Sequence, residues 1–309
     1  MIKGQRLRDG YLHPCTEDKA QVLWFSNLTT AEKELLQTRY HLDEHAINSA
    51  LDPDEVSRIE FHPNYLFLIW KRPENYTGSS GFSFDVSSFG LLLSRDQLLL
   101  ICDDDRQLDG IGAREPLVEP LDVLLDLLLN NIHHYLGHLK VIKMIARELQ
   151  QKFNESMNSQ HLQQMFNLSE SLVYYVNAIH SNGTVLSRLR NHAQKHEYHS
   201  DCLALIDDMI IENDQCYKQA SIYSTVFATL MDARGNMLNN STNNLLRKLT
   251  VINVVFLPLN LITGIGGMSE YSMMTAPVAW WFSYPALIIG MGGLGGLMML
   301  GLRRMAKTS

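Results

Sequence analysis

Residues 249–302 read LTVINVVFLPLNLITGIGGMSEYSMMTAPVAWWFSYPALIIGMGGLGGLMMLGL, and Glu270 is the only charged residue among them. A hydrocarbon core of about 30 Å requires roughly 20 apolar residues in a helix, so this stretch holds two spans and a short loop. We predict transmembrane helices at 249–265 and 278–302, joined by an outer loop at 266–277. The second helix is long enough to cross the bilayer with some tilt.

The rest of the chain has an ordinary soluble composition. The 309 residues are 46% hydrophobic and 19% charged, with a formal net charge of −7. At roughly 150 residues per domain this length predicts about two structural units. The composition excludes disordered, collagen-like and disulfide-scaffold proteins. The lack of a basic excess argues against binding of nucleic acid. We therefore predict a membrane protein with a large soluble portion.

Neither the amino terminus nor the cysteines indicate a secreted protein. The first ten residues, MIKGQRLRDG, lack the apolar segment of a cleavable signal peptide. The cysteines form no CxxC pair and are scattered along the chain, at Cys15, Cys102, Cys202 and Cys216. We predict reduced thiols rather than a disulfide framework or a metal cluster.

The prolines divide the soluble portion. No proline lies between Pro120 and Pro258, and an interior proline costs a helix about 3 kcal/mol. We predict two long helices over 121–190 and a third from about residue 193 that continues into the membrane to about Gly264. Residues 121–248 would then form a funnel or stalk of long helices.

Residues 1–120 have a mixed pattern. Short aromatic and aliphatic runs predict strands, and two segments have helical spacing preceded by capping residues. The strands are expected at 22–25, 65–70, 82–93 and 98–102, and the helices at 30–39 and 43–51, with Thr29 or Thr30 and Asp43 as caps. This pattern predicts an α/β domain, so the fold class is an α+β membrane protein.

Charges flanking the spans set the predicted orientation. The basic residues lie before the first span or after the second, at Arg247, Lys248, Arg303, Arg304 and Lys307, and the outer loop has none. Lysine and arginine accumulate on the cytoplasmic side of membranes. We predict a multi-pass protein of the inner (plasma) membrane with both termini cytoplasmic and a basic tail at 303–309.

The second span carries two features that a simple anchor does not need. Trp280, Trp281 and Tyr284 are expected to form an aromatic belt at the outer interface. Gly292 and Gly296 have the small-xxx-small spacing that lets helices approach closely.

A polar stripe runs along the first span. Its members follow steps of three and four residues, which place them on one helical face: Thr250, Asn253, Leu257, Asn260 and Gly264, continued upstream by Asn243 and Leu246. An amide facing lipid is costly, so the stripe requires a polar surrounding. It fits a water-filled pathway among several copies, and it fits equally well hydrogen bonds between helices.

The chemistry of the spans favours a hydrated ion. No set of histidine, cysteine or carboxylate ligands lies within them, which argues against tight, dehydrated metal binding. Amides, hydroxyls and carbonyls suit a hard cation that keeps its water. Leu246, Leu249 and Leu257 are candidate hydrophobic constrictions, which can gate a pore by dewetting.

Other charged groups carry weaker hypotheses. Glu270, repeated around a ring, would concentrate cations at the outer mouth; otherwise it is a solvated loop carboxylate. Two sets could bind a regulatory divalent metal, although a solvated surface is the commoner explanation: His192, His196 and His199 with Asp201, and the acidic run Asp207, Asp208, Glu212 and Asp214. A weaker histidine set comprises His133, His134 and His138.

Several stretches resemble the CorA superfamily of divalent-cation transporters. They lie in the expected order along the chain: 42–53 (LDEHAINSALDP), 65–70 (YLFLIW), 242–252 (TNNLLRKLTVI), 256–259 (FLPL), 263–271 (TGIGGMSEY) and 281–285 (WFSYP). The resemblance covers essentially the whole chain. It implies a homopentamer in the lipid bilayer, with the first span lining the pore, a helical funnel and cytoplasmic metal-sensing sites. Divalent cations are then substrate and regulator, with no other cofactor.

One position departs from the family signature. The family has Gly-Met-Asn after the first span, where a ring of five asparagines and backbone carbonyls meets hydrated Mg²⁺; this chain has Gly267, Met268 and Ser269. A serine hydroxyl is shorter than an amide, and the zinc-transporting ZntB branch also tolerates variation here. The resemblance therefore implies transport of Zn²⁺ or Mg²⁺, with Co²⁺ and Ni²⁺ open.

Two other classes of function compete with transport. The altered motif and the leucine constrictions are compatible with a membrane-anchored signalling or scaffold protein whose pore does not conduct. A membrane-tethered enzyme would need a reactive motif, and the sequence has no nucleophile elbow, phosphate loop or HExxH. We therefore predict that the protein is not an enzyme.

Overall fold

The computed structural model describes residues 2–74, 83–103, 116–153, 159–274 and 276–308. Within these ranges, the side chains of 152–153, 159–160, 270–272, 280 and 303–308 lie outside the description. The chain forms two compact units, unit 1 (Met1–Met231) and unit 2 (Asp232–Ser309). Helix α5 (Ser200–Gly266) contributes to both.

Unit 1 contains a seven-stranded sheet with the order β2-β1-β3-β7-β6-β5-β4. The strands are β1 (Ile2–Arg8), β2 (Tyr11–Cys15), β3 (Val22–Ser26), β4 (Arg58–Phe61), β5 (Tyr65–Pro73), β6 (Val86–Ser94) and β7 (Leu98–Cys102). Only the central pair β3 and β7 is parallel among these seven strands, with Val22 opposite Leu98. The other neighbours are antiparallel.

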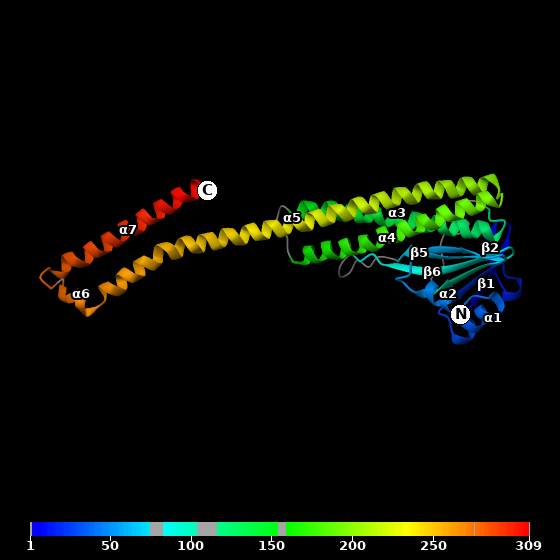
Figure 1. Cartoon of the computed structure of the whole chain (residues 1–309), viewed down its shortest axis with the longest axis horizontal. Coiled ribbons are helices and arrows are strands. Elements are labelled where there is room, and N and C mark those ends of the chain that lie inside the picture. The colour runs from blue at the N-terminus through cyan, green and yellow to red at the C-terminus, as the bar shows by residue number, and fades with distance from the viewer. Residues whose placement is uncertain (1, 75–82, 104–115, 154–158, 275, 309) are drawn as a thin grey trace. The chain divides into compact units, whose positions relative to one another are not determined.

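Helices cover both faces of this sheet (Figure 1). α1 (Thr30–Tyr40) and α2 (Glu44–Leu51) pack on one face. α3 (Pro120–Phe153), α4 (Ser159–Lys195) and the first part of α5 pack on the other. Every residue of β3 and β7 is therefore buried, which explains why both read as continuous apolar runs instead of alternating ones.

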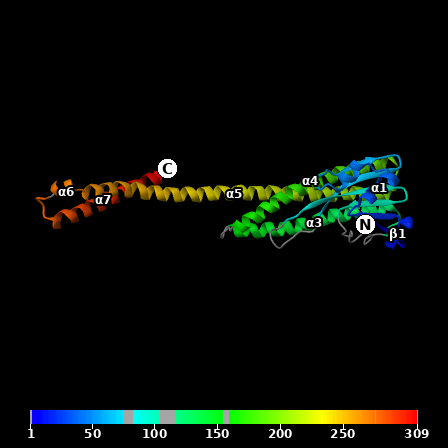
Figure 2. The same cartoon turned by 90° about the horizontal axis from the view of Figure 1, so that it is seen from below.

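The three long helices also form a core of their own (Figures 1 and 2). Tyr135 and Leu139 of α3 pack with Leu172 and Tyr175 of α4 and with Phe227 of α5. The rings of Tyr135 and Tyr175 meet edge to face with their centroids 5.0 Å apart. This packing stabilises helices much longer than isolated propensity supports in water.

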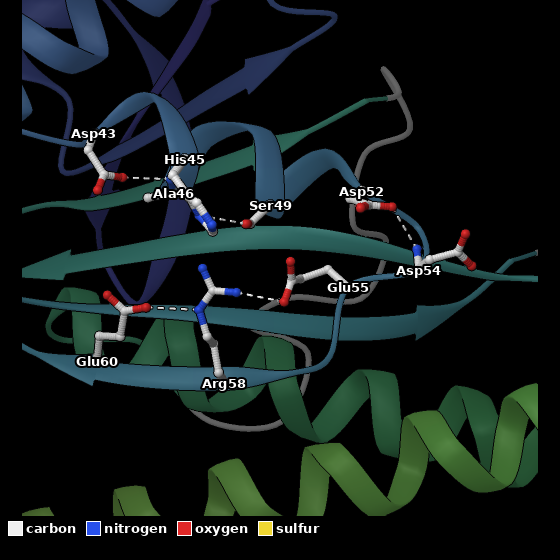
Figure 3. Close-up of polar contacts among 9 residues, drawn as sticks. All are labelled: Asp43, His45, Ala46, Ser49, Asp52, Asp54, Glu55, Arg58 and Glu60. Atoms are coloured by element: carbon white, nitrogen blue, oxygen red, sulfur yellow. Dashed lines mark hydrogen bonds and ion pairs between the residues drawn. The ribbon is translucent and has the colours of Figure 1, made fainter.

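The predicted caps of the short helices are present. The Thr29 hydroxyl accepts from the backbone N–H of Glu32, whose carboxylate accepts from the N–H of Thr29 at 2.8 Å. The Asp43 carboxylate accepts from the N–H of Ala46 at 2.6 Å (Figure 3). Each cap satisfies a backbone donor that the helix leaves unpaired, so α1 and α2 begin where the sequence predicted.

The sequence prediction of the sheet was incomplete. β1, β2 and β4 were not expected, because polar residues interrupt their apolar ones and most of their residues remain partly exposed in the sheet. In β4 the guanidinium of Arg58 lies between the carboxylates of Glu55 and Glu60, at 2.7 and 2.8 Å (Figure 3). The run expected at 82–93 starts later, since β6 begins at Val86 and residue 82 lies outside the described part.

Unit 2 consists of the end of α5, the short helix α6 (Ser269–Met274) and α7 (Trp280–Thr308). α5 and α7 each contain a stretch long and apolar enough to cross a membrane. α5 continues through Pro258 to Gly266, as expected for a helix running into the membrane. α6 was not predicted and lies within the segment expected to be an outer loop.

Candidate ion pathway

The polar stripe lies on an uncovered face of α5. Its members Asn243, Thr250, Asn253, Asn260 and Gly264 are all exposed in the single chain. Within the described residues, the amides of Asn253 and Asn260 have no hydrogen-bond partner. A polar group in this position needs water or a second chain, because a bare amide in lipid is costly.

The opposite face of α5 packs against α7. A Cβ atom placed on Gly295 would lie 3.4 Å from Cδ1 of Leu259 and 4.0 Å from Cγ1 of Val255. Ile262 lines a groove shared with Leu287 of α7. At about 100° per residue, these α5 side chains point about 180° away from the stripe. Helix α7 of the same chain is therefore not the polar partner of the stripe.

The threonine hydroxyls present oxygen rather than hydrogen to their surroundings. The Thr250 hydroxyl donates to the carbonyl of Leu246 at 2.8 Å, and the Thr263 hydroxyl donates to the carbonyl of Asn260 at 2.9 Å. Since each proton is used within the helix, the remaining lone pairs are acceptors. Hydroxyl and amide oxygens are ligands that suit hydrated divalent cations.

The three candidate constriction residues are exposed on the same helix. Leu246 and Leu257 belong to the stripe, and Leu257 is 70% exposed. At about 100° per residue, Leu249 lies about 60° around the helix from the centre of the stripe. Leu249 is 56% exposed. Nothing within the described chain covers these side chains, so they can face an axis shared with other copies.

The altered signature residues follow directly on the end of α5. The N–H of Gly267 donates to the carbonyl of Thr263 at 3.0 Å, and that of Met268 donates to Ile265 at 3.1 Å. Ser269 is the first residue of α6, and Met268 is 57% exposed. The Glu270 side chain lies outside the described part. The backbone thus places Gly267, Met268 and Ser269 where the first span ends.

The acidic run on α5 is largely paired inside the chain. Asp207 accepts from the guanidinium of Arg190 on α4 at 2.7 Å. Glu212 contacts His133 on α3, and Asp214 pairs with the Lys218 ammonium at 2.6 Å. The contacts of Asp207 and Glu212 attach α5 to α4 and α3, the pair of Asp214 and Lys218 lies within α5, and Asp208 is exposed.

Two of the three candidate metal-binding histidines, His192 and His196, belong to a stack of aromatic rings. The His192 ring lies on Phe61 with centroids 4.1 Å apart and planes 9° from parallel, and His196 lies 4.1 Å from His192. Burial, together with the charge of His196, lowers the pKa of His192. His199 and Asp201 are exposed. Among the described residues, no group of three or more histidine, cysteine or acidic side chains is arranged to hold a metal.

His138 belongs to the core of the long helices. Its Nδ1 lies 2.7 Å from the hydroxyl of Tyr175, and the residue is 5% exposed. Burial, helped by the neighbouring His134, lowers the pKa of His138 to about 4. His138 is therefore neutral at neutral pH and acts as a polar member of the core.

Sequence reasoning missed the residues that attach the long helices to the sheet and to one another. The Asn182 amide oxygen accepts from the Ser57 hydroxyl at 2.7 Å and from the Lys71 N–H at 3.1 Å. Its nitrogen donates to the Lys71 carbonyl at 2.8 Å. The fully buried Asn182 thereby takes the place of a strand neighbour for Lys71, which lies beyond the point where β4 begins, with Arg58 opposite Ile69. Asn213 of α5 similarly donates to the Ile179 carbonyl of α4 at 3.0 Å.

Comparisons with known proteins match this architecture along nearly the whole chain. The family model described as CorA-like Mg2+ transporter protein matches residues 19–304. The cobalt/magnesium transport protein CorA of Methanocaldococcus jannaschii is 22% identical over 284 residues, covering 87% of both chains.

Solved structures show the same fold. The complete CorA magnesium transporter of Methanocaldococcus jannaschii has a TM-score of 0.71 at 17% identity, covering 100% of this chain and 98% of that one. The full-length CmaX protein has a TM-score of 0.73 at 14% identity, covering 97% of each chain. With a family model matched over residues 19–304, the chain belongs to the CorA-like Mg2+ transporter protein family.

Proposed function

We propose that this protein carries divalent metal cations across the inner membrane, through a pore lined by the polar stripe of α5 at the axis of a homopentamer. The number five rests on family resemblance. Mg²⁺ and Co²⁺ are the first candidates, because the matched relative is named a cobalt/magnesium transport protein. We place both termini in the cytoplasm, on the positive charges that flank the spans.

One observation carries the proposal: the stripe and the α7 contact occupy opposite faces of the same helix. Val255 and Leu259 meet α7, while the exposed amides of Asn253 and Asn260 point away from it. A ring of copies would let α7 face lipid and leave the amides around a shared aqueous axis. Homo-oligomers with closed symmetry commonly build such an axis.

The side chains of the stripe suit an ion that keeps its water. Amide and hydroxyl oxygens can accept from the water shell of a cation, so the ion need not lose that shell completely. Leucines at 246, 249 and 257 would narrow the axis with apolar rings, which resist wetting and so close the pore. Asp208 of the acidic run is exposed. It therefore remains a proposed ligand of a regulatory metal ion on α5.

The serine at position 269 bears on which ion is selected. The serine side chain is shorter than that of the asparagine in the family signature, and its acceptor is a hydroxyl oxygen instead of an amide oxygen. We propose a broader selectivity, with Zn²⁺ and Ni²⁺ admitted beside Mg²⁺ and Co²⁺. Ser269→Asn would then increase the preference for Mg²⁺ over Zn²⁺ in competition assays.

The test is metal flux into sealed proteoliposomes. Full-length protein should admit Mg²⁺ and Co²⁺ into vesicles loaded with a metal-sensitive dye, while empty vesicles should not. Its mass in mild detergent with retained lipid should be that of a closed ring. Flux absent for all four metals in an intact ring would favour the non-conducting scaffold; a monomer would remove the pore model.

A further inference from the structure

One edge of the sheet in unit 1 gathers residues that the transport function does not use. β3 and β7 begin there, at Val22 and Leu98, which are paired neighbours. β6 ends there opposite the start of β5, with Ser94 paired to Tyr65, and β4 ends at Phe61. The topology therefore brings chain ends from several strands to the same place.

A cavity of about 390 Å³ opens at this edge. Two stacked pairs of rings line it: Phe61 lies on His192, and His62 lies on Tyr65 with centroids 4.4 Å apart. Phe61 is 41% exposed, so His192 covers only part of its ring. Asn64 adds an exposed amide beside the rings. Exposed, ordered ring stacks are surfaces on which a nucleobase can stack.

A second, polar cavity of about 560 Å³ adjoins the first, and both are lined by Arg95, Glu119 and Pro120. Arg95 directly follows the end of β6, next to Ser94. Arg6 and Lys19 also line the second cavity. Within the described part of the chain, none of these three cations forms an ion pair.

The lining of the second cavity holds three cations against two carboxylates, Asp96 and Glu119. Guanidinium groups bind phosphate through paired hydrogen bonds. The carboxylates would repel a bare polyphosphate but suit one that carries Mg²⁺, whose bound waters donate to carboxylate oxygens. Apolar and aromatic surface on one side and cations on the other form the two halves of a nucleotide site. The volumes are those of ordinary ligand pockets, roughly 300–1,000 Å³.

We propose that this double cavity binds a nucleoside polyphosphate as its magnesium complex. The base stacks against the Phe61 side of the first cavity, and the phosphates lie against Arg95, with Arg6 and Lys19 beyond it. The site is separate from the α5 stripe and independent of whether the chain conducts ions. A nucleotide bound there would contact the stacked rings of Phe61 on β4 and His192 on α4. This ring contact joins the sheet to a long helix.

The experiment is direct binding to the purified full-length chain in detergent micelles with Mg²⁺ present, measured by equilibrium dialysis. ATP is expected to saturate one site per chain. Tripolyphosphate should bind at least about tenfold more weakly, because it has no base to stack on the rings. Adenosine should also bind at least about tenfold more weakly, because it has no phosphate to accept charge-assisted hydrogen bonds from Arg95.

Two substitutions assign the binding to this edge. Arg95→Ala and Phe61→Leu should each weaken ATP binding about tenfold or more, with the near-ultraviolet circular dichroism unchanged. Arg39→Ala is the matched control, because Arg39 lies at the end of α1 over Tyr40, on the other face of the sheet. It should leave the affinity for ATP unaltered.

Three results would each overturn the assignment. The first is no saturation by ATP at roughly 1 mM. The second is ATP binding that survives both Arg95→Ala and Phe61→Leu, which would place the nucleotide elsewhere. The third is tripolyphosphate binding as tightly as ATP, which would leave the ring stacks without a role.

Discussion

The two units of the chain differ in the burial of their apolar residues. In unit 1 the described leucines and phenylalanines of β3 and β7, and most of those of the long helices, are buried against one another. In unit 2 no described side chain is fully buried. The last fully buried side chain along the chain is that of Phe227 on α5, which belongs to unit 1. Leu257 and Phe256 are more than half exposed although both are apolar.

This difference shows that unit 1 supplies its own interior, whereas unit 2 requires surroundings. Soluble monomers rarely expose apolar surface of this extent. Lipid can cover the apolar part, but it cannot satisfy the amides of Asn253 and Asn260. The comparison therefore separates residues that stabilise the chain from residues whose partners are water, ions or other copies.

The largest expected effect contrasts one leucine from each unit. Leu128 is 0% exposed on α3, in the core against the sheet, and Leu128→Ala should destabilise unit 1 by about 2–5 kcal/mol. Leu257→Ala removes the same atoms from an exposed site and should leave the unfolding midpoint unchanged. Thermal melts of the full chain in micelles, followed by near-ultraviolet circular dichroism, test both. Equal loss of stability in the two variants would contradict the distinction.

The second prediction concerns the stripe. Asn260→Leu places an apolar ring at the proposed axis and should lower metal flux about tenfold or more by dewetting, with the oligomer intact. Ile252→Leu, a conservative change on the same helix away from the stripe, is the control. Flux and oligomer mass are measured on one preparation.

The same variant distinguishes the competing role of the amides. If Asn260 bonds to a helix of another copy, Asn260→Leu should loosen the oligomer by about 0.6–2 kcal/mol per hydrogen bond. A stable ring with normal flux would remove Asn260 from the pathway altogether.

The third prediction sharpens the description of unit 1 as a self-contained core. His138 has its pKa lowered to about 4 by burial, so between pH 6.5 and 4 the unfolded chain binds a proton that the folded chain does not. Stability should therefore fall as the pH falls through this window, by up to about 3 kcal/mol. His138→Gln should reduce the slope, and His13→Gln, at an exposed histidine, should not. Identical slopes would mean that His138 titrates normally.

The smallest effect is expected at the outer mouth. Glu270→Gln should lower flux about two- to threefold at low metal and low salt, because a ring of carboxylates raises the local cation concentration. At high salt the difference should vanish through screening. Flux assays at two ionic strengths measure it, and unchanged flux in both would make Glu270 a bystander.

The sequence identified those elements whose signal is local. The stretch 249–302, in which Glu270 is the only charged residue, predicted both apolar helices, and the proline-free interval predicted the long helices. Asp43 was recognised as a cap, and Thr29 as one of two candidates beside Thr30, because a cap acts within four residues. The polar stripe was visible since a helix repeats every 3.6 residues. The resemblance to the CorA superfamily rested on the same local runs, and the family match confirms it.

The tertiary structure decided what depends on residues distant in sequence. β1, β2 and β4 are partly polar and join the sheet only through their paired neighbours. Asn182 meets Lys71 across 111 positions, and Phe61 reaches His192 on α4. The sequence likewise did not determine which face of α5 meets α7, and the contact between Gly295 and Leu259 shows which face it is. Periodicity states which residues share a face, but only packing determines what that face meets, because the partner is selected by shape and burial over the whole chain.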